Sequence, residues 1–398
     1  MDIRTFISCF GTSRPAKGVI LSSVLCLLLS SSPVFAASPR KARELTTPAS
    51  DRRITFVGRT VQQGSDVSFD WSGVYARIRF RGTYLAMRAS DTRRNYYNVW
   101  IDRPMSEEPD KVISTHGTDS LIVLLSAEEA FERGGGKKLS PDSGEHLVVI
   151  QKRTEGEQGK TTVHSFLTIG DMLQAEGIRD RVIEIVGDSY TCGYGSENSV
   201  RSDPFKPETE NCNKSYSCIV PRYFGADYIH VAHSGMGIAR NYNDNVKGWY
   251  MPERYLQSLD MDRESRWTPQ TGVKPDITII YLGTNDFSTS RQPTMDAFVR
   301  GYITLLQEIK DNYGEAHPIL CMASKADYYL SYCIHEVMTR CGMLNVSFGA
   351  FGDMIHDNDS DLGASWHPNY QGHRKISMGM IPYVSTMTGW PLADNPIK

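Results

Sequence analysis

A serine stands directly behind an apolar run in the stretch VIEIVGDSYTCGYG, which begins at Val182. The apolar residues stop at Gly187, and Ser189 follows after one aspartate. For an isolated Gly-Asp-Ser sequence, a serine that caps a helix or turn is the commoner case. A serine nucleophile needs a base to take its proton and hydrogen-bond donors for the oxyanion. The catalytic interpretation therefore depends on whether other parts of the chain supply those groups.

Three later stretches contain groups of the required kinds. Asn285 in IYLGTNDFS carries an amide that can donate to an oxyanion, although an Asx turn would also explain it. Gly235 in AHSGMG offers a backbone N–H, with Gly237 as the alternative if the register differs, and a tight turn is the ordinary explanation. In SWHPNYQGH, His367 is expected in a loop and is the preferred base, whereas His373 is expected on a helix, packed or partly exposed.

The elements around these residues predict an α/β domain over residues 180–390. Compact apolar runs alternate with longer segments, of which three predict helices, over about 295–312, 326–340 and 369–387. This alternation predicts a doubly wound parallel sheet that is covered on both faces. Ligands of such sheets bind beyond the carboxyl ends of the strands, so the serine, glycine and asparagine motifs are expected at one edge.

Residues 51–175 have a different pattern. In VYARIRFR, apolar side chains alternate with arginines, which is typical of a half-buried antiparallel strand. Similar short runs follow, separated by turn-like stretches and without a long helix between them. This half therefore predicts a β-sandwich.

The start of the chain predicts export. Basic residues precede an apolar run that ends in small residues, which is typical of a secretory signal over residues 1–36 with cleavage near Ala36. Residues 37–50 are expected to be a loose polar leader, and the mature protein is expected to be secreted or periplasmic. No later apolar run is long enough to span a bilayer. The net charge of −3 and the lack of a basic cluster argue against a nucleic-acid partner.

Six of the eight cysteines lie beyond the predicted signal, and an even number in an exported protein predicts disulfides. Cys212 and Cys218 are close enough in sequence to close a short loop. Cys333 and Cys341 can pair only if the predicted helix ends before Cys341, because eight residues of helix separate them too far. No C-x-x-C pair occurs, so no structural zinc site is expected.

The four blocks GDSYTCGYGSEN, SGMGIARNY, GTNDFS and WHPNYQGH resemble, in this order, those of the SGNH (GDSL-type) hydrolases. The fuller strings are most similar to carbohydrate esterase family 2, the acetylxylan-esterase-like deacetylases. That resemblance implies a jelly-roll-like sandwich before the SGNH domain and no metal or cofactor. It also implies Ser189 as nucleophile, His367 as base, and an oxyanion hole made of Ser189, Gly235 and Asn285.

One position departs from the family pattern. The superfamily usually has an aspartate three residues before the histidine, and this chain has Ala364 there. A triad needs a group that accepts the second imidazole N–H and fixes the tautomer. Either a backbone carbonyl fills that role, which gives a Ser-His dyad and is preferred, or one of four nearby aspartates folds back: Asp353, Asp357, Asp359 or Asp361.

The resemblance implies an exported esterase that removes O-acetyl groups from plant polysaccharides such as xylan or mannan. Tyr190, Trp366 and Trp267 could stack on a sugar ring, with packing the favoured role for Trp267. Asp188 and Asp286 are expected to hold their loops by hydrogen bonds. Two alternatives stay open: an esterase for lipid or aryl esters, and a glycan-binding protein without catalysis. The sequence does not indicate the oligomeric state.

Overall fold

The computed structural model describes residues 43–136, 144–244, 249–268, 273–324 and 328–398. The predicted signal and the first part of the predicted leader lie outside the described residues. Within the described ranges, no helix combines the length and the apolar composition needed to cross a membrane.

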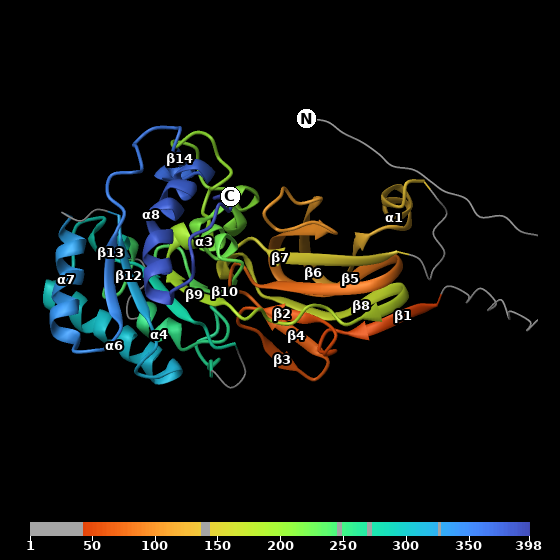
Figure 1. The fold of residues 1–398 in the computed structure, drawn as a ribbon, viewed down its shortest axis with the longest axis horizontal. Coiled ribbons are helices and arrows are strands. Elements are labelled where there is room, and N and C mark those ends of the chain that lie inside the picture. The colour runs from red at the N-terminus through yellow and green to blue at the C-terminus, as the bar shows by residue number, and fades with distance from the viewer. Residues whose placement is uncertain (1–42, 137–143, 245–248, 269–272, 325–327) are drawn as a thin grey trace, which may run out of the picture. The chain divides into compact units, whose positions relative to one another are not determined.

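The N-terminal half forms one antiparallel sheet of eight strands (Figure 1). The strands are β1 (Glu44–Pro48), β2 (Thr55–Val57), β3 (Val61–Gln63), β4 (Asp66–Phe69), β5 (Tyr75–Ile101), β6 (Lys111–Leu125), β7 (Glu145–Lys152) and β8 (Thr161–Leu173). Between β6 and β7 lies helix α1 (Ala127–Arg133), which the sequence analysis did not predict. A capping box formed by Ser126 and Glu129 starts this helix.

The structure does not confirm the predicted jelly-roll-like sandwich. Two of the short runs expected as separate strands, VYARIRFR and NYYNVWI, belong to β5, which has 27 residues and pairs with β2, β6, β7 and β8. Its first part, Tyr75–Arg81, and its last part, Tyr97–Ile101, both pair with β7. Because both parts of one strand reach the same neighbour, the strands stay in one hydrogen-bonded network. Bulges near Asp91 let the long strand bend where the sequence suggested a turn.

The predicted leader also differs from the structure, because β1 lies within residues 37–50. This strand pairs with β8 from Glu44 opposite Ile169 to Pro48 opposite Ser165. Thr47 is buried by that pairing. The polar composition of the segment suits an edge strand as well as a loose leader, so composition alone could not distinguish the two.

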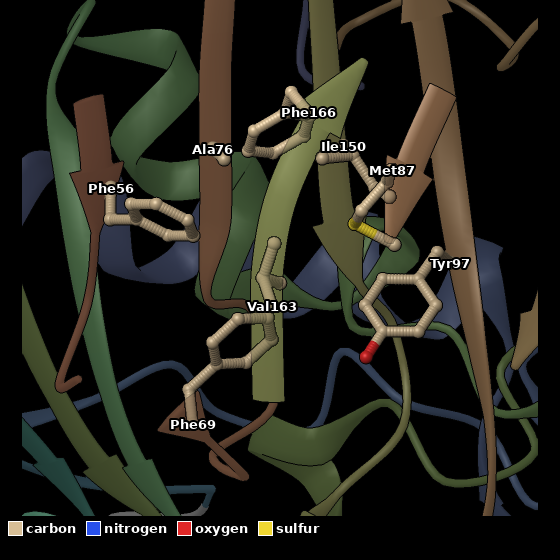
Figure 2. Close-up of a pocket in the computed structure, with 8 residues that line it drawn as sticks. All are labelled: Phe56, Phe69, Ala76, Met87, Tyr97, Ile150, Val163 and Phe166. Atoms are coloured by element: carbon tan, nitrogen blue, oxygen red, sulfur yellow. The ribbon is translucent and has the colours of Figure 1, made fainter. Parts of the chain in front are cut away.

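Apolar side chains fill the interior of the antiparallel sheet. Figure 2 shows the rings of Phe56, Phe69, Tyr97 and Phe166 around a cavity of about 10 Å³. That volume is close to the smallest that accommodates one water molecule, so the cavity is part of the core and not a ligand site.

The second half contains a parallel sheet of five strands in the order β10-β9-β11-β12-β13, which confirms the predicted parallel sheet. These strands are β9 (Val182–Gly187), β10 (Asp227–Ala232), β11 (Ile277–Tyr281), β12 (Ile319–Ala323) and β13 (Val346–Ala350), and a short antiparallel pair follows, β14 (Leu362–Gly363) with β15 (His367–Pro368). The helices are α2 (Ser189–Cys192), α3 (Tyr216–Tyr223), α4 (Met251–Tyr255), α5 (Thr284–Phe287), α6 (Met295–Tyr313), α7 (Tyr329–Cys341) and α8 (Tyr370–Thr388). The three helices predicted from the sequence correspond to α6, α7 and α8, apart from residues 326 and 327, which lie outside the described residues.

Alternate residues of the parallel strands face two different layers of helices. On β9, Ile183 and Ile185 pack in one apolar cluster with side chains of α3 and α8. Val182 and Val186 belong to another cluster, which contains side chains of α6 and α7. The sheet is therefore covered on both faces, as a doubly wound domain requires.

Buried polar contacts join the two halves within one compact unit. Arg59 pairs with Glu184 at 3.2 Å, and both side chains are fully buried. Arg77 pairs with Asp227, whose carboxylate also accepts a hydrogen bond of 2.8 Å from the Tyr75 hydroxyl. Because buried charges are costly without partners, these pairs favour one arrangement of the two halves.

The structure corrects the predicted disulfide framework, because all six cysteines beyond the predicted signal are free thiols. Cys333 and Cys341 lie on the same helix, α7, which does not end before Cys341. Cys212 and Cys218 do lie near each other in the interior, with their sulfur atoms within 4.8 Å.

Candidate active site

Ser189 lies at the carboxyl edge of the parallel sheet, where β9 ends and α2 begins. The turn between them is tight, because a Cβ atom at Gly187 would lie 1.9 Å from the Thr191 hydroxyl. Asp188 caps α2 by accepting the Tyr190 N–H at 3.1 Å. Among the described residues, no acceptor is found for the Ser189 N–H, and Ser189 lines a cavity at this edge.

His367 lies against Ser189, with 2.8 Å between its Nε2 and the serine Oγ. Its Nδ1 lies 3.0 Å from the Ser365 carbonyl oxygen. The carbonyl can only accept, so Nδ1 carries the proton and Nε2 presents its lone pair to the serine hydroxyl. Burial lowers the pKa of His367 to about 4, so the imidazole is neutral at pH 7 and can act as a base.

The histidine loop, residues 363–368, is held by main-chain contacts. Ser365 and Trp366 adopt left-handed backbone conformations with φ of 52° and 59°. Such conformations are costly for residues other than glycine and persist only where the surroundings fix them. The Ser365 N–H donates to the Asp203 carbonyl at 2.9 Å, and the Trp366 N–H donates to the Arg201 carbonyl at 3.0 Å.

Among the described residues, no aspartate contacts His367 in place of the missing acid. Ala364 itself is fully buried, and a Cβ at Gly195 would lie 2.6 Å from its methyl group. Asp357 and Asp359 both bond to Arg201, and Asp361 bonds to Lys375. The Ser365 carbonyl is thus the group that orients the imidazole.

Gly235 lies after β10 and lines the same cavity as the histidine loop, with φ of 77°. No acceptor for its N–H is found in the described part of the chain. The alternative, Gly237, already donates to the Asn241 side chain at 3.1 Å. This difference favours Gly235 as the donor that is available to a ligand.

Asn285 also reaches the cavity, but its amide is engaged. The Nδ2 atom donates to Asp188 at 3.0 Å and to the Met236 carbonyl at 2.8 Å. An amide nitrogen has two hydrogens, so Asn285 must share or release one of these contacts to donate to an oxyanion.

Two buried carboxylates hold the loops, as expected from the sequence. Asp286 accepts the N–H groups of three successive residues, Ile238, Ala239 and Arg240, at 2.9, 2.7 and 2.9 Å. Burial raises the pKa of Asp286 to about 6 and that of Asp188 to about 7. His373 is fully buried on α8 and does not line the cavity.

The cavity has a volume of about 630 Å³ and a mixed polar and aromatic lining. Tyr190 and Trp366 line it, and Trp366 is exposed over 54% of its surface. Trp267 does not belong to the site: it is buried beneath the Arg59 guanidinium, 4.9 Å from the ring centre, which corrects its tentative assignment to substrate binding. Sequence reasoning missed Tyr194, whose ring lies between those of His367 at 4.3 Å and Phe205 at 3.9 Å.

Two buried groups away from the Ser189–His367 pair have the composition of metal ligands. One consists of Cys212, Cys218 and His230, and the other of Glu155, Cys192 and Glu210. Neither includes a residue that lines the cavity.

Two family profiles match the chain. The profile of the GDSL-like Lipase/Acylhydrolase family matches residues 185–375, which include both Ser189 and His367. The profile called Carbohydrate esterase 2 N-terminal matches residues 56–134, within the antiparallel sheet.

Characterised relatives agree with these profiles. The chain is 30% identical over 80% of its length to the cellulase/esterase CelE of Acetivibrio thermocellus, and it spans 38% of that protein's length. It is 25% identical to an acetylxylan esterase / glucomannan deacetylase of Cellvibrio japonicus, with 93% of this chain and 98% of the relative covered.

Among solved structures, a family two carbohydrate esterase from Clostridium thermocellum in complex with cellohexaose has a TM-score of 0.74 and 28% identity. The match covers 85% of this chain and 100% of the other. A family two carbohydrate esterase from Cellvibrio japonicus, at 23% identity and a TM-score of 0.75, supports the fold over 87% of this chain and 99% of the other.

Proposed function

We propose that this chain, which belongs with the carboxylic ester hydrolases of carbohydrate esterase family 2, removes O-acetyl groups from plant cell-wall polysaccharides. It joins a GDSL-type acylhydrolase domain to the N-terminal domain of that family. The contact that carries the proposal is the 2.8 Å distance between the serine Oγ and the lone-pair nitrogen of His367. Ser189 and Gly235, whose N–H groups find no acceptor in the described part of the chain, line the same cavity.

The reaction proceeds in two steps. Ser189 Oγ attacks the acetyl carbonyl carbon while His367 Nε2 takes the hydroxyl proton, and the oxyanion accepts hydrogen bonds from the Ser189 and Gly235 N–H groups. Asn285 adds a third donor when its amide turns from a protein acceptor toward the oxyanion. His367 then gives its proton to the departing sugar oxygen, and the C–O ester bond breaks.

Water completes the turnover. It attacks the acetyl-enzyme, His367 takes its proton, and the second tetrahedral intermediate releases acetate and restores the serine hydroxyl as the proton returns. The Ser365 carbonyl stabilises the imidazolium that forms in each step, so Ser189 and His367 act as a dyad.

Several features support a carbohydrate substrate over the lipid or aryl esters of the alternative. The cavity wall contains the exposed face of Trp366 and the ring of Tyr190, and aromatic faces pack well against sugar rings. Polar groups border the same space, including Glu157 and Ser288. The relatives named acetylxylan esterase / glucomannan deacetylase suggest xylan and glucomannan as polymers, and the apolar run of the predicted signal, residues 1–36, suggests an exported enzyme.

The decisive experiment measures acetate release from acetylated xylan and acetylated glucomannan, with NMR to identify which acetyl groups disappear. The wild-type protein should release acetate, and Ser189→Ala should not, although both should unfold at similar temperatures. Binding of the glycans without acetate release by the wild-type protein would favour the non-catalytic alternative. Faster cleavage of long-chain acyl esters than of either glycan would favour a lipid esterase.

A further inference from the structure

We propose that Glu155, from the antiparallel half of the chain, is a positioning residue for the oxyanion donors. This inference rests on the proposed esterase function. Glu155 follows strand β7 and precedes the short 3₁₀ helix η1 (Gly156–Gln158). Its side chain is 1% exposed, and its Oε2 accepts the Ser234 N–H at 2.7 Å.

The carboxylate of Glu155 contacts both segments that carry the unengaged N–H groups. Ser234 immediately precedes Gly235, and Cys192 lies in α2, which begins at Ser189. The Cys192 thiol donates to the same Oε2 at 3.7 Å. One buried oxygen therefore connects the loop after β10 to the helix after β9.

Glu155 is itself held firmly. Its carbonyl accepts a hydrogen bond of 2.9 Å from the Lys152 ammonium, and its N–H donates to Glu210 at 3.3 Å. Burial raises the pKa of Glu210 well above its usual range.

His233, the residue before Ser234, is held by Glu157 of η1 and by Asp260. His233 Nδ1 lies 2.8 Å from Asp260, and His233 Nε2 lies 3.3 Å from Glu157. Gly156 packs directly against that aspartate, since a Cβ there would lie 2.1 Å from its oxygen. Two successive residues, His233 and Ser234, are thus fixed by η1 and its neighbours.

This arrangement suits a backbone oxyanion donor. Such a donor lowers the barrier only when its peptide plane is oriented before the reaction begins. Glu155 limits the rotation of the Ser234 backbone, and with it the direction of the Gly235 N–H.

The test compares three variants of Glu155 with wild type, using 4-nitrophenyl acetate and acetylated xylan. Glu155→Gln keeps an acceptor oxygen at the same reach, and kcat should stay within about fivefold. Glu155→Leu removes the acceptor, and Glu155→Asp keeps the charge but shortens the reach. Both variants should lower kcat by roughly 10- to 100-fold and leave KM within about threefold of wild type. The larger of these losses of kcat equals the smaller losses seen when one oxyanion donor is removed.

The matched control is Asp91→Asn, because Asp91 is a buried carboxylate of the same sheet that bonds to Thr115 and Thr161 and does not line the cavity. It should lower the unfolding temperature and leave kcat unchanged. A kcat for Glu155→Asp above that for Glu155→Gln would overturn the proposal, because charge and not reach would then matter. A kcat for Glu155→Leu within threefold of wild type would also overturn the proposal. If Glu155→Leu does not fold, the comparison of kcat between Glu155→Asp and Glu155→Gln decides. Activity retained by Ser189→Ala would instead contradict the proposed function itself.

Discussion

Two loops that line the cavity are held in different ways. The histidine loop depends on main-chain contacts, because the Ser365 carbonyl orients His367 and the carbonyls of Arg201 and Asp203 fix the loop. The glycine loop, residues 233–240, depends on buried carboxylates, because Glu155 and Asp286 accept four of its N–H groups. The comparison teaches that no carboxylate contacts the proposed base among the described residues, whereas two buried carboxylates hold the loop that carries the proposed oxyanion donor Gly235.

The largest expected effect distinguishes the two histidines of the WHPNYQGH stretch. His367→Ala should lower kcat by roughly 10⁴-fold or more, because nucleophile and base act as a unit. His373→Ala should keep kcat within about fivefold but lower the unfolding temperature, since removal of a buried ring leaves a cavity. Steady-state kinetics and thermal unfolding of both variants provide the measurement, and a reversed order of the two kcat values would show that the base is misassigned.

On the glycine side, Asn285→Ala should lower kcat by about 10²- to 10³-fold with a smaller change in KM. Asn285→Asp has nearly the same volume but lacks the donor and adds charge beside Asp188, so it should be at least as damaging. A change confined to KM, or full activity of the aspartate variant, would mean that Asn285 serves only its two contacts to Asp188 and Met236.

A smaller effect is expected from the aspartates near the histidine loop. Single Asn substitutions at Asp353, Asp357, Asp359 and Asp361 should each leave kcat within about tenfold, because in the proposed dyad the Ser365 carbonyl orients His367. Asp361→Asn should also lower stability through the lost contact with Lys375. A loss of kcat of about 10⁴-fold in any one of these variants, as expected when a triad acid is neutralised, would show that an aspartate orients His367. The difference between the two loops would then not hold.

The smallest effect concerns pH. The base must be unprotonated, and with a pKa of about 4 His367 stays so as the pH falls from 7 to 5. Its protonation should therefore lower kcat/KM by less than about twofold over this range, whereas an ordinary imidazole with a pKa of about 6.5 would give roughly 25-fold. Asp188, with a pKa of about 7, also titrates in this pH range. A fall in kcat/KM that is absent from the pH profile of Asp188→Asn is therefore assigned to the Asp188 carboxyl. A step near pH 6.5 that persists in this variant would contradict the depressed pKa of His367.

The sequence predicted the parallel half well because its signals are local. Glycines at the ends of apolar runs mark Ser189, Gly235 and Asn285, and period and length predict α6 and α8. The elements that the prediction missed depend on contacts between distant residues. Nothing near Glu155 indicates that its partner is Ser234, 79 residues later, and the turn-like residues inside β5 conceal one continuous strand.

The buried pairs between the halves have a consequence for the order of synthesis. Arg59, Trp71 and Arg77 are made before the groups that satisfy them, namely Glu184, the Ser258 carbonyl and Asp227. Synthesis from the N-terminus therefore delivers Arg59 before its counter-ion, Arg77 with only the exposed Glu176 carboxylate close by in sequence, and an indole N–H before its acceptor. The antiparallel half therefore cannot satisfy the Trp71 N–H until Ser258, 85 residues beyond the end of β8 at Leu173, has been made.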